Sequence, residues 1–313
     1  MKKAIVLLIT LALLSIISTL IVVSLNISTK NLDRVAYIDA QNQFSLVFKD
    51  FVKIIKNFSK DINDSQTLDM FLSNSTLPGL YDEKSGITIG MMVETKMDRI
   101  NLNYLLNQLV QNSKNGDVNL TSEFLLTPLE KFSAFYRLSD SALFIDLLLD
   151  TIDQDQEERA PFSEISALDF DFREGKVFSF NHLKKIFNHY YKLSHDERIF
   201  AITENDFDRF FYFGDTKKYG LLDCNRVSSE VMKLLIRDDF DMQDSDYCTL
   251  FKDPPDELKK IKKIYNITDF DKNSKYLVEC QVILNTDEFN QTVSFDFDIN
   301  SARIESIDKN TKE

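Results

Sequence analysis

Residues 1–25 read MKKAIVLLITLALLSIISTLIVVSL, and this stretch decides the architecture of the chain. Behind Lys2 and Lys3, the run from Ala4 to Leu25 is apolar apart from a few serines and threonines. At about 1.5 Å of rise per helical residue, such a run crosses a hydrocarbon core of about 30 Å. Positive residues stay on the cytoplasmic side of a span. We therefore expect residues 1–25 to be a single transmembrane helix in the bacterial inner membrane, with the bulk of the chain in the periplasm.

A cleaved secretory signal is the alternative interpretation of the same residues. Such signals have an apolar core of about 7–15 residues and a cleavage site of small residues. The run here is longer, and Ser24, Leu25 and Asn26 match a cleavage site poorly. Retention of the helix is therefore the preferred interpretation.

The remainder of the 313-residue chain is acidic. The whole sequence holds 37 basic and 50 acidic residues, for a formal net charge of −13. A nucleic-acid groove needs a basic face, so no nucleic acid is expected as a partner. The three cysteines, Cys224, Cys248 and Cys280, allow three pairings. Outside the cytoplasm one disulfide and one free thiol are expected, and Cys224 with Cys248 is the easier pair.

Helical spacing continues beyond the apolar run. Apolar residues recur at Val35, Ile38, Phe44, Val47, Phe48, Phe51, Ile54, Ile55 and Phe58, without proline or glycine before Pro78. This pattern predicts one long helix, half in the membrane and half outside it, with an amphipathic outer half. Residues 61–76 are then rich in turn-forming residues, and Pro78-Gly79 is expected to end this segment.

The rest of the chain predicts an α+β protein with a helical insertion. Strands are expected at 86–94, 219–224, 276–284, 292–299 and 302–307, where 286–288 would turn a hairpin. Helices are expected at 105–110, 124–135, 139–152 (capped by Ser139 or Asp140), 181–191, 204–213 and 228–236 (capped by Ser228). We divide the chain into 1–25 (the span), 26–104 (helix extension and first strands), 105–215 (inserted helical domain) and 216–313 (closing strands).

The densest carboxylate cluster holds Asp150, Asp153, Asp155, Glu157, Glu158 and Glu164. Counting Asp153 as the first position of an EF-type loop places Asp155 third, Glu157 fifth and Glu164 twelfth, which is a possible calcium ligand set. Glu158 stands where such a loop needs glycine, so a solvated acidic loop is the alternative. The histidines, His182, His189 and His195, fit no metal spacing and are expected at the surface or the core edge.

Four segments, in order, resemble a known family. They are Ala4–Ile9 (AIVLLI), Ile87–Asn103 ending in DRINLN, Leu143–Arg159 (LFIDLLLDTIDQDQEER) and Gly220–Leu235 (GLLDCNRVSSEVMKLL). Together they resemble the minor pseudopilin of type II secretion called general secretion pathway protein K. Ile9 stands where ordinary pseudopilins carry a glutamate, which this family also lacks. Prepilin peptidase cuts the family after a glycine, whereas this chain offers Lys3, Ala4 and Ile5 as its processing site. Thr151 replaces the family's tryptophan, so the chain resembles a divergent member.

The resemblance implies a pilin-like fold, with a long N-terminal helix on an antiparallel sheet and a large inserted all-helical domain. It also implies structural calcium in the helical domain. The function would be non-enzymatic: capping the tip of a periplasmic pseudopilus in type II protein secretion or a related DNA-uptake machine. The partners would be other minor pseudopilins, bound through Val35, Phe44, Phe48, Phe51 and Ile55 of the N-terminal helix, and the secretion machinery of the inner membrane. A membrane-anchored periplasmic sensory or binding domain, unrelated to pili, is the alternative. No GxSxG, P-loop or GxGxxG motif supports catalysis.

Overall fold

The structure is a computed structural model that describes residues 38, 41–75, 77–82, 87–114, 120–216, 222–236, 247–285 and 290–312. The expected transmembrane helix, the processing site at Lys3, Ala4 and Ile5, Val35 and the 286–288 turn lie outside these residues. Within the described part of the chain, no helix is both long and apolar enough to cross a membrane.

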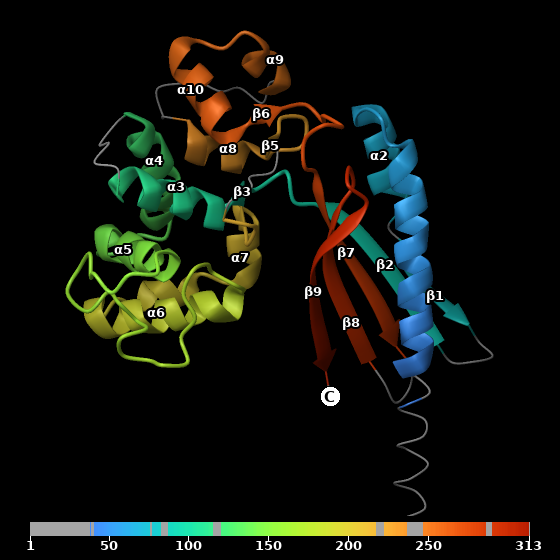
Figure 1. Cartoon of the computed structure of the whole chain (residues 1–313), viewed down its shortest axis with the longest axis horizontal. Helices are drawn as coiled ribbons and strands as arrows, with labels where there is room; N and C mark the ends of the chain where they lie inside the picture. The colour runs from blue at the N-terminus through green and yellow to red at the C-terminus, as the bar shows by residue number, and fades with distance from the viewer. Residues whose placement is uncertain are drawn as a thin grey trace, which may run out of the picture.

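A five-stranded antiparallel sheet forms one unit of the molecule (Figure 1). Its order is β1 (Leu77–Asp82), β2 (Ile87–Thr95), β7 (Leu277–Asn285), β8 (Asn290–Asp298) and β9 (Arg303–Lys312). The register places Cys280 of β7 between Val93 of β2 and Phe295 of β8. The predicted strands 86–94, 276–284, 292–299 and 302–307 are thereby confirmed, and the α+β class with an antiparallel sheet holds. Pro78-Gly79 was expected to close a segment but lies in edge strand β1, where a missing N–H is tolerated.

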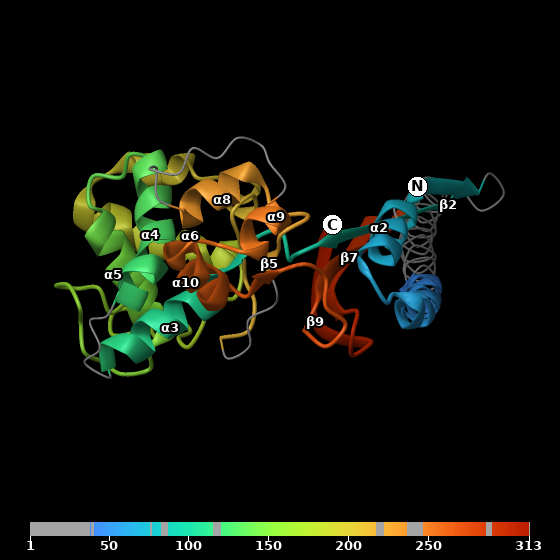
Figure 2. The same cartoon turned by 90° about the horizontal axis from the view of Figure 1, so that it is seen from above.

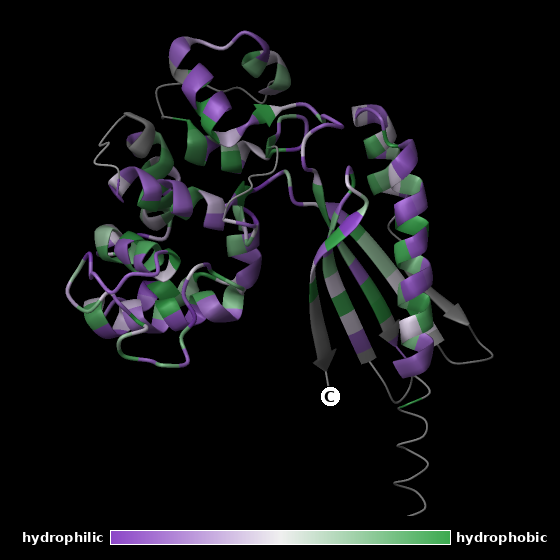
Figure 3. Cartoon of the chain, in the orientation of Figure 1, coloured by the Kyte–Doolittle hydropathy of each residue, from purple (hydrophilic) through white to green (hydrophobic). Residues whose placement is uncertain are grey.

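The N-terminal helix, described over residues 41–58, packs along the sheet face that is turned away from the helical unit (Figures 1 and 2). Phe44, Phe51 and Ile55 are buried in the core of the sheet unit, and Phe48 packs edge-on against Phe295 at 5.3 Å between ring centroids. These residues were expected to face partner subunits. That expectation is corrected because they cover the chain's own sheet. Polar and apolar bands alternate along this helix (Figure 3).

After η1 (Ser59–Asp61) the chain forms α2 (Ser65–Asn74), where turn-rich sequence was expected. The cause is a capping box: Asp64 Oδ1 accepts from the Thr67 N–H at 2.8 Å, and Thr67 Oγ1 accepts from the Asp64 N–H. Leu68 and Phe71 of α2 then bury their side chains in the core of the sheet unit. The polar residues of this segment therefore begin a helix and do not interrupt one.

A helical unit is inserted between β2 and β7. In chain order it holds β3 (Ile100–Asn101), α3 (Leu102–Lys114), α4 (Leu120–Phe135), α5 (Ser141–Ile152), α6 (Phe180–Ser194), η2 (Glu197–Ala201), α7 (Glu204–Asp208), β4 (Phe211–Tyr212), β5 (Leu222–Asp223), α8 (Ser229–Leu235), α9 (Tyr247–Lys252), α10 (Asp256–Tyr265) and β6 (Ile267–Thr268). Two short parallel pairs, β3 with β4 and β5 with β6, bring distant parts of it together.

The insertion ends later than the sequence analysis placed it. Apart from Tyr212, the buried apolar residues from Ile100 to Ile267 form one core. Tyr212, Phe270 and the buried apolar residues after Phe270 belong to the core of the sheet unit. The described residues of 222–267, which the division by sequence placed in segment 216–313, are thus part of the helical unit. The helix predicted at 204–213 is shorter in the structure. It ends at Asp208 as α7, and β4 follows.

Two predicted caps are present. Asp140, one of the two alternatives for α5, accepts from the Leu143 N–H at 2.9 Å, and Ser228 caps α8 by accepting from the Val231 N–H at 3.2 Å. Asn101 accepts from the Tyr104 N–H at 3.2 Å at the start of α3. The sequence therefore sets these helix starts locally.

A buried polar network joins the two units. The Tyr276 hydroxyl donates to Asp223 at 2.9 Å and accepts from Thr95 Oγ1 at 3.1 Å. Arg226 pairs with both Asp223 and Asp69 of α2. Beside it, Cys224 and Cys248 form a disulfide, the easier of the three pairings, while Cys280 is free and buried in the sheet.

Candidate functional site

Three buried carboxylates converge at the C-terminal end of α5. Asp150 lies in its last turn, Asp153 is its C-cap, and Glu164 comes from the loop that follows. One oxygen of each lies within 4.8 Å of the others, which is close enough to share one cation. Such a donor set contains only oxygen, which is what hard cations such as calcium prefer.

One arginine partly neutralises this cluster. The Arg159 guanidinium pairs with Asp150 and with Asp153, and its backbone N–H donates to Asp150 Oδ2 at 3.2 Å. Ser163 Oγ also donates to Asp150. Asp150 is therefore well satisfied, whereas the other carboxylates of the cluster are not.

At this cluster, three buried carboxylate oxygens have no hydrogen-bond donor among the described residues. They are Oδ1 of Asp153, Oε2 of Glu164 and Oε1 of Glu174. Burial, followed by the neighbouring Glu174 carboxyl, raises the pKa of Glu164 to about 7, and burial also raises the pKa of Asp153. Buried, unpaired carboxylates are costly without a proton or a cation. These orphaned oxygens make the residues present a fit for a calcium ion.

The structure brings together two of the four calcium ligands predicted from the sequence. Asp153 and Glu164 meet, but Asp155 pairs with Lys114 at 2.8 Å and accepts from the Glu157 N–H at 3.1 Å, while the Glu157 side chain is exposed. The EF-type spacing missed Glu174, which arrives from the far end of the loop. Only the folded path of residues 164–174 could have shown that these two glutamates meet.

Two histidines of α6 hold the loop that carries Glu164. His189 Nε2 lies 2.7 Å from the Phe162 carbonyl oxygen, and His182 Nδ1 accepts from the Phe178 N–H at 3.3 Å. The His182 ring also packs against the Phe172 ring, with 4.5 Å between the ring centroids, and burial lowers the pKa of His182. Both lie at the core edge, as expected, while His195 is the left-handed C-cap of α6.

A second apolar face of the N-terminal helix is exposed. Leu46, Ile54 and Phe58 are exposed, and Ile54 and Phe58 are one turn apart. No described segment covers these side chains. We call these three residues the outer helix face.

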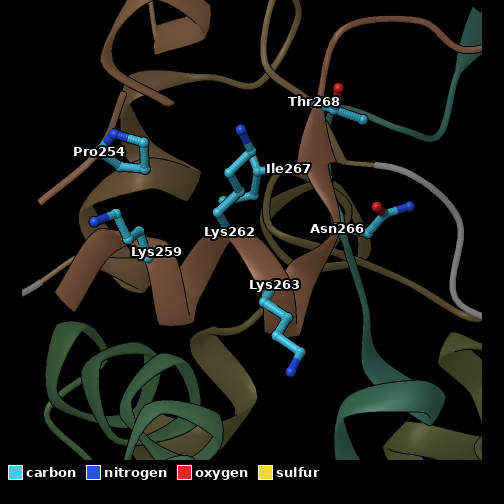
Figure 4. A pocket seen from close by; sticks show the side chains of 7 residues that line it. All are labelled: Pro254, Lys259, Lys262, Lys263, Asn266, Ile267 and Thr268. Carbon is cyan, nitrogen blue, oxygen red and sulfur yellow. The ribbon is translucent and has the colours of Figure 1, made fainter. Parts of the chain in front are cut away.

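A pocket of about 450 Å³ lies beside α10 (Figure 4). It is lined by Pro254, Lys259, Lys262, Lys263, Asn266, Ile267 and Thr268. Lys262 Nζ donates to the Phe251 carbonyl at 2.6 Å and Lys259 pairs with Asp256 at 2.9 Å, while Lys263 points away from the other two lysines in Figure 4. The three ammonium groups do not converge, so the pocket forms no anion cradle.

Comparison with known proteins gives a likeness in structure but none in sequence. No protein-family model matches the chain, and no curated protein matches it. Among solved structures, the chain is similar to a chain in the crystal structure of the GspK-GspI-GspJ complex from the enterotoxigenic Escherichia coli type 2 secretion system. The two are 11% identical with a TM-score of 0.49, over 87% of this chain and 98% of that one. A likeness at this level does not assign the chain to a family.

Proposed function

We propose that the chain is a non-enzymatic minor pseudopilin that caps the tip of a periplasmic pseudopilus in type II secretion or a related DNA-uptake machine. One observation carries this proposal. A helix from the N-terminal side lies along one face of an antiparallel sheet, and a helical unit is inserted between the second and third strands of that sheet. This is the arrangement that the four sequence segments imply through their resemblance to minor pseudopilins.

The membrane anchor belongs to the same proposal. The apolar run from Ala4 to Leu25 would hold the subunit in the inner membrane before assembly, with both folded units in the periplasm. The disulfide between Cys224 and Cys248 agrees with an oxidising compartment.

Partner pseudopilins would bind the outer helix face. Of the side chains first expected to meet partners, Phe44, Phe51 and Ile55 are buried in the core of the sheet unit, whereas Leu46, Ile54 and Phe58 of the same helix are exposed and available to a partner. An amphipathic helix packs against such a stripe through residues one turn apart. The exposed apolar residues therefore border the residues of the helix that face the sheet.

The N-terminus of the mature protein tests the pseudopilin role. Intact mass and N-terminal sequence would be measured on protein purified from native membranes. A chain that starts at Ala4 or Ile5 with an N-methyl group supports processing as a pseudopilin. A cut near Asn26 would identify a plain secreted protein and would end the proposal.

We also propose that the α5 carboxylate cluster binds structural calcium. The orphaned oxygens of Asp153, Glu164 and Glu174 favour it, with Asp150 beside them. The bound ion would neutralise buried charge and fix the loop between α5 and α6. At a calcium concentration one hundred times its dissociation constant, the folded state gains about 2.7 kcal/mol. Thermal unfolding in EDTA, calcium and magnesium tests this, and an unchanged midpoint in millimolar calcium would contradict it.

A further inference from the structure

Arg159 is the cation that the carboxylate cluster at the end of α5 already contains. Its guanidinium pairs with two buried side chains, with Asp150 through Nη1 and with Asp153 through Nη2. The arginine lies in the same loop as Glu164, between the end of α5 and that glutamate. A positive charge of the chain itself therefore occupies oxygens that a metal ion at this cluster would use.

Arg159 satisfies the two aspartates unequally. Both oxygens of Asp150 have donors: Oδ1 accepts from the guanidinium, and Oδ2 accepts from the Arg159 N–H at 3.2 Å and from the Ser163 hydroxyl. Asp153 Oδ2 pairs with the guanidinium, but its Oδ1 is buried with no donor among the described residues. The guanidinium thus balances charge at the cluster without satisfying every oxygen.

The two glutamates of the cluster have even less compensation. Oε2 of Glu164 and Oε1 of Glu174 are buried with no hydrogen-bond partner in the described part of the chain. Lys114 is the other cation nearby, and it pairs with Asp155 at 2.8 Å, where both side chains are more exposed. Buried carboxylates are costly unless an opposite charge or a donor compensates each of them. The cluster is therefore built for more positive charge than Arg159 supplies.

A calcium ion and the guanidinium would compete for the same atoms. Calcium takes roughly six to eight oxygen ligands at about 2.3–2.6 Å. One oxygen each of Asp150, Asp153 and Glu164 lies within 4.8 Å of the others, so an ion that uses this set needs both aspartates. Two cations on one pair of buried carboxylates repel each other strongly, because little water screens them. Ion binding should therefore weaken or break the pairs with Arg159.

The displaced guanidinium can reach the surface. The Arg159 side chain is 21% exposed in the structure, so it already touches solvent. Glu157 and Glu158, directly before it, are exposed, and Asp146, one helical turn before Asp150, lies within electrostatic reach of it. Water and these carboxyl groups can receive the charge, so releasing Arg159 does not leave an unpaired cation in the core.

We propose that Arg159 is an internal counter-cation that gives up its place when calcium binds. In the ion-free chain it compensates Asp150 and Asp153, and in the calcium-bound chain it releases both carboxylates and moves to the surface. This inference rests on the calcium site proposed above and deepens it, because it names the group with which the ion competes. Arg159 therefore lowers the affinity for calcium while it keeps the ion-free chain folded.

Calcium affinity tests the exchange. Isothermal titration calorimetry would use the full chain in nanodiscs of zwitterionic lipid, with empty nanodiscs as the blank. Arg159→Gln should bind calcium at least tenfold more tightly than the parent, and without calcium it should unfold at a lower temperature. Arg173→Gln is the matched control, because it removes the same charge from an exposed arginine beside Glu174, and its affinity should stay within about threefold of the parent.

The possible outcomes separate this inference from the calcium site on which it rests. Equal or weaker binding by Arg159→Gln, with calcium bound by the parent, would show that the arginine positions the ligands, and it would overturn the exchange alone. A parent chain that binds no calcium would overturn the site itself, and the exchange with it.

A second measurement needs no variant, so it remains decisive if Arg159→Gln fails to fold. Phenylglyoxal modifies accessible guanidinium groups, and peptide mass spectrometry measures the rate at each arginine of the parent chain. Calcium should raise the rate at Arg159 at least threefold relative to sodium chloride of equal ionic strength, and it should leave the rate at Arg173 unchanged. An unchanged or slower rate at Arg159 in a chain that binds calcium would contradict the exchange.

Discussion

The Tyr276 hydroxyl donates a 2.9 Å hydrogen bond to the Asp223 carboxylate across the boundary between the sheet unit and the helical unit. Both side chains are fully buried, and Arg226 completes the network by pairing with Asp223 and Asp69. Burial raises the pKa of Tyr276, so the phenol remains a donor across the physiological range. The two units are therefore joined by a hydrogen-bonded network whose centre, Tyr276 and Asp223, is buried.

Tyr276→Phe tests that joint. The substitution removes one donor from a buried carboxylate, so the free energy of unfolding should fall by about 1–3 kcal/mol. Urea unfolding measures the change. Tyr136→Phe is the matched control, because the Tyr136 hydroxyl has no hydrogen bond within the described residues, and it should stay within about 0.5 kcal/mol of the parent. Equal effects in the two variants would show that the network does not hold the units together.

Asp208 should make stability depend on pH. Burial is the main cause that raises the pKa of Asp208, to about 6 in the folded chain against an ordinary value of 3.8. Folding then favours the protonated form, so stability is lost as pH rises from about 4 to about 6. Asp208→Asn should be more stable than the parent by about 1 kcal/mol at pH 7, after discounting for partial exposure, and nearly equal to it at pH 4.

Asp206 supplies the opposite control for that experiment. The Thr203 side chain and backbone lower the pKa of Asp206, which belongs to the capping box of α7. Its contribution to stability is present at neutral pH and lost in acid. Asp206→Asn should therefore destabilise the chain at pH 7. If both variants change stability in the same direction at pH 7, the assigned pKa directions are wrong.

Glu164→Gln tests the carboxylate cluster with and without calcium. In EDTA, the buried Glu164 carboxyl of the parent has a pKa of about 7. The free energy of unfolding therefore falls between about pH 4.5 and 7, because the folded chain disfavours the ionised form. The variant should gain about 2 kcal/mol at pH 8 in EDTA and should lose the rise in melting temperature that calcium gives the parent. Glu157→Gln, at an exposed carboxylate, should keep that rise. Loss of the calcium effect in both variants would place the ion elsewhere.

The disulfide gives a prediction about thiols. Mass spectrometry after maleimide labelling should find no adduct on the folded, unreduced chain, because Cys280 is buried and burial raises its pKa. Unfolding should add one label, and reduction with unfolding should add three. The Cys224→Ser/Cys248→Ser variant should lose about 2–4 kcal/mol, since the loop it opens spans a sequence separation of 24. Early labelling of Cys280 would show that the sheet opens.

The sequence predicted the parts of the fold that local chemistry sets. Alternation located β2, β7 and β8, and the cap residues Asp140 and Ser228 located the starts of α5 and α8. It missed α2, because Asp64 and Thr67 were taken for turn residues although they form a capping box. It also missed the end of the insertion, because no local signal says which core Leu258 and Ile261 join.

Periodicity alone could not say what covers an apolar stripe. Phe44, Phe51 and Ile55 have the spacing of an interface, yet the sheet of the same chain covers them. The candidate site shows a similar limit. Asp153 and Glu164 were found by spacing, but the partner of Glu164 is Glu174, which only the folded loop brings near. Contacts between distant residues depend on the path of the backbone, which local patterns do not encode.

Photocrosslinking in native membranes tests the central claim most directly. A photoreactive phenylalanine would replace Ile54 or Phe58 on the outer helix face, with positions Phe48, which faces the sheet, and Phe200, on the helical unit, as controls. We predict that positions 54 and 58 form covalent adducts with other pseudopilins, identified by mass spectrometry, and that the two control positions do not. Adducts at 54 and 58 with unrelated membrane proteins alone, or no adducts at either position, would contradict the assembly role.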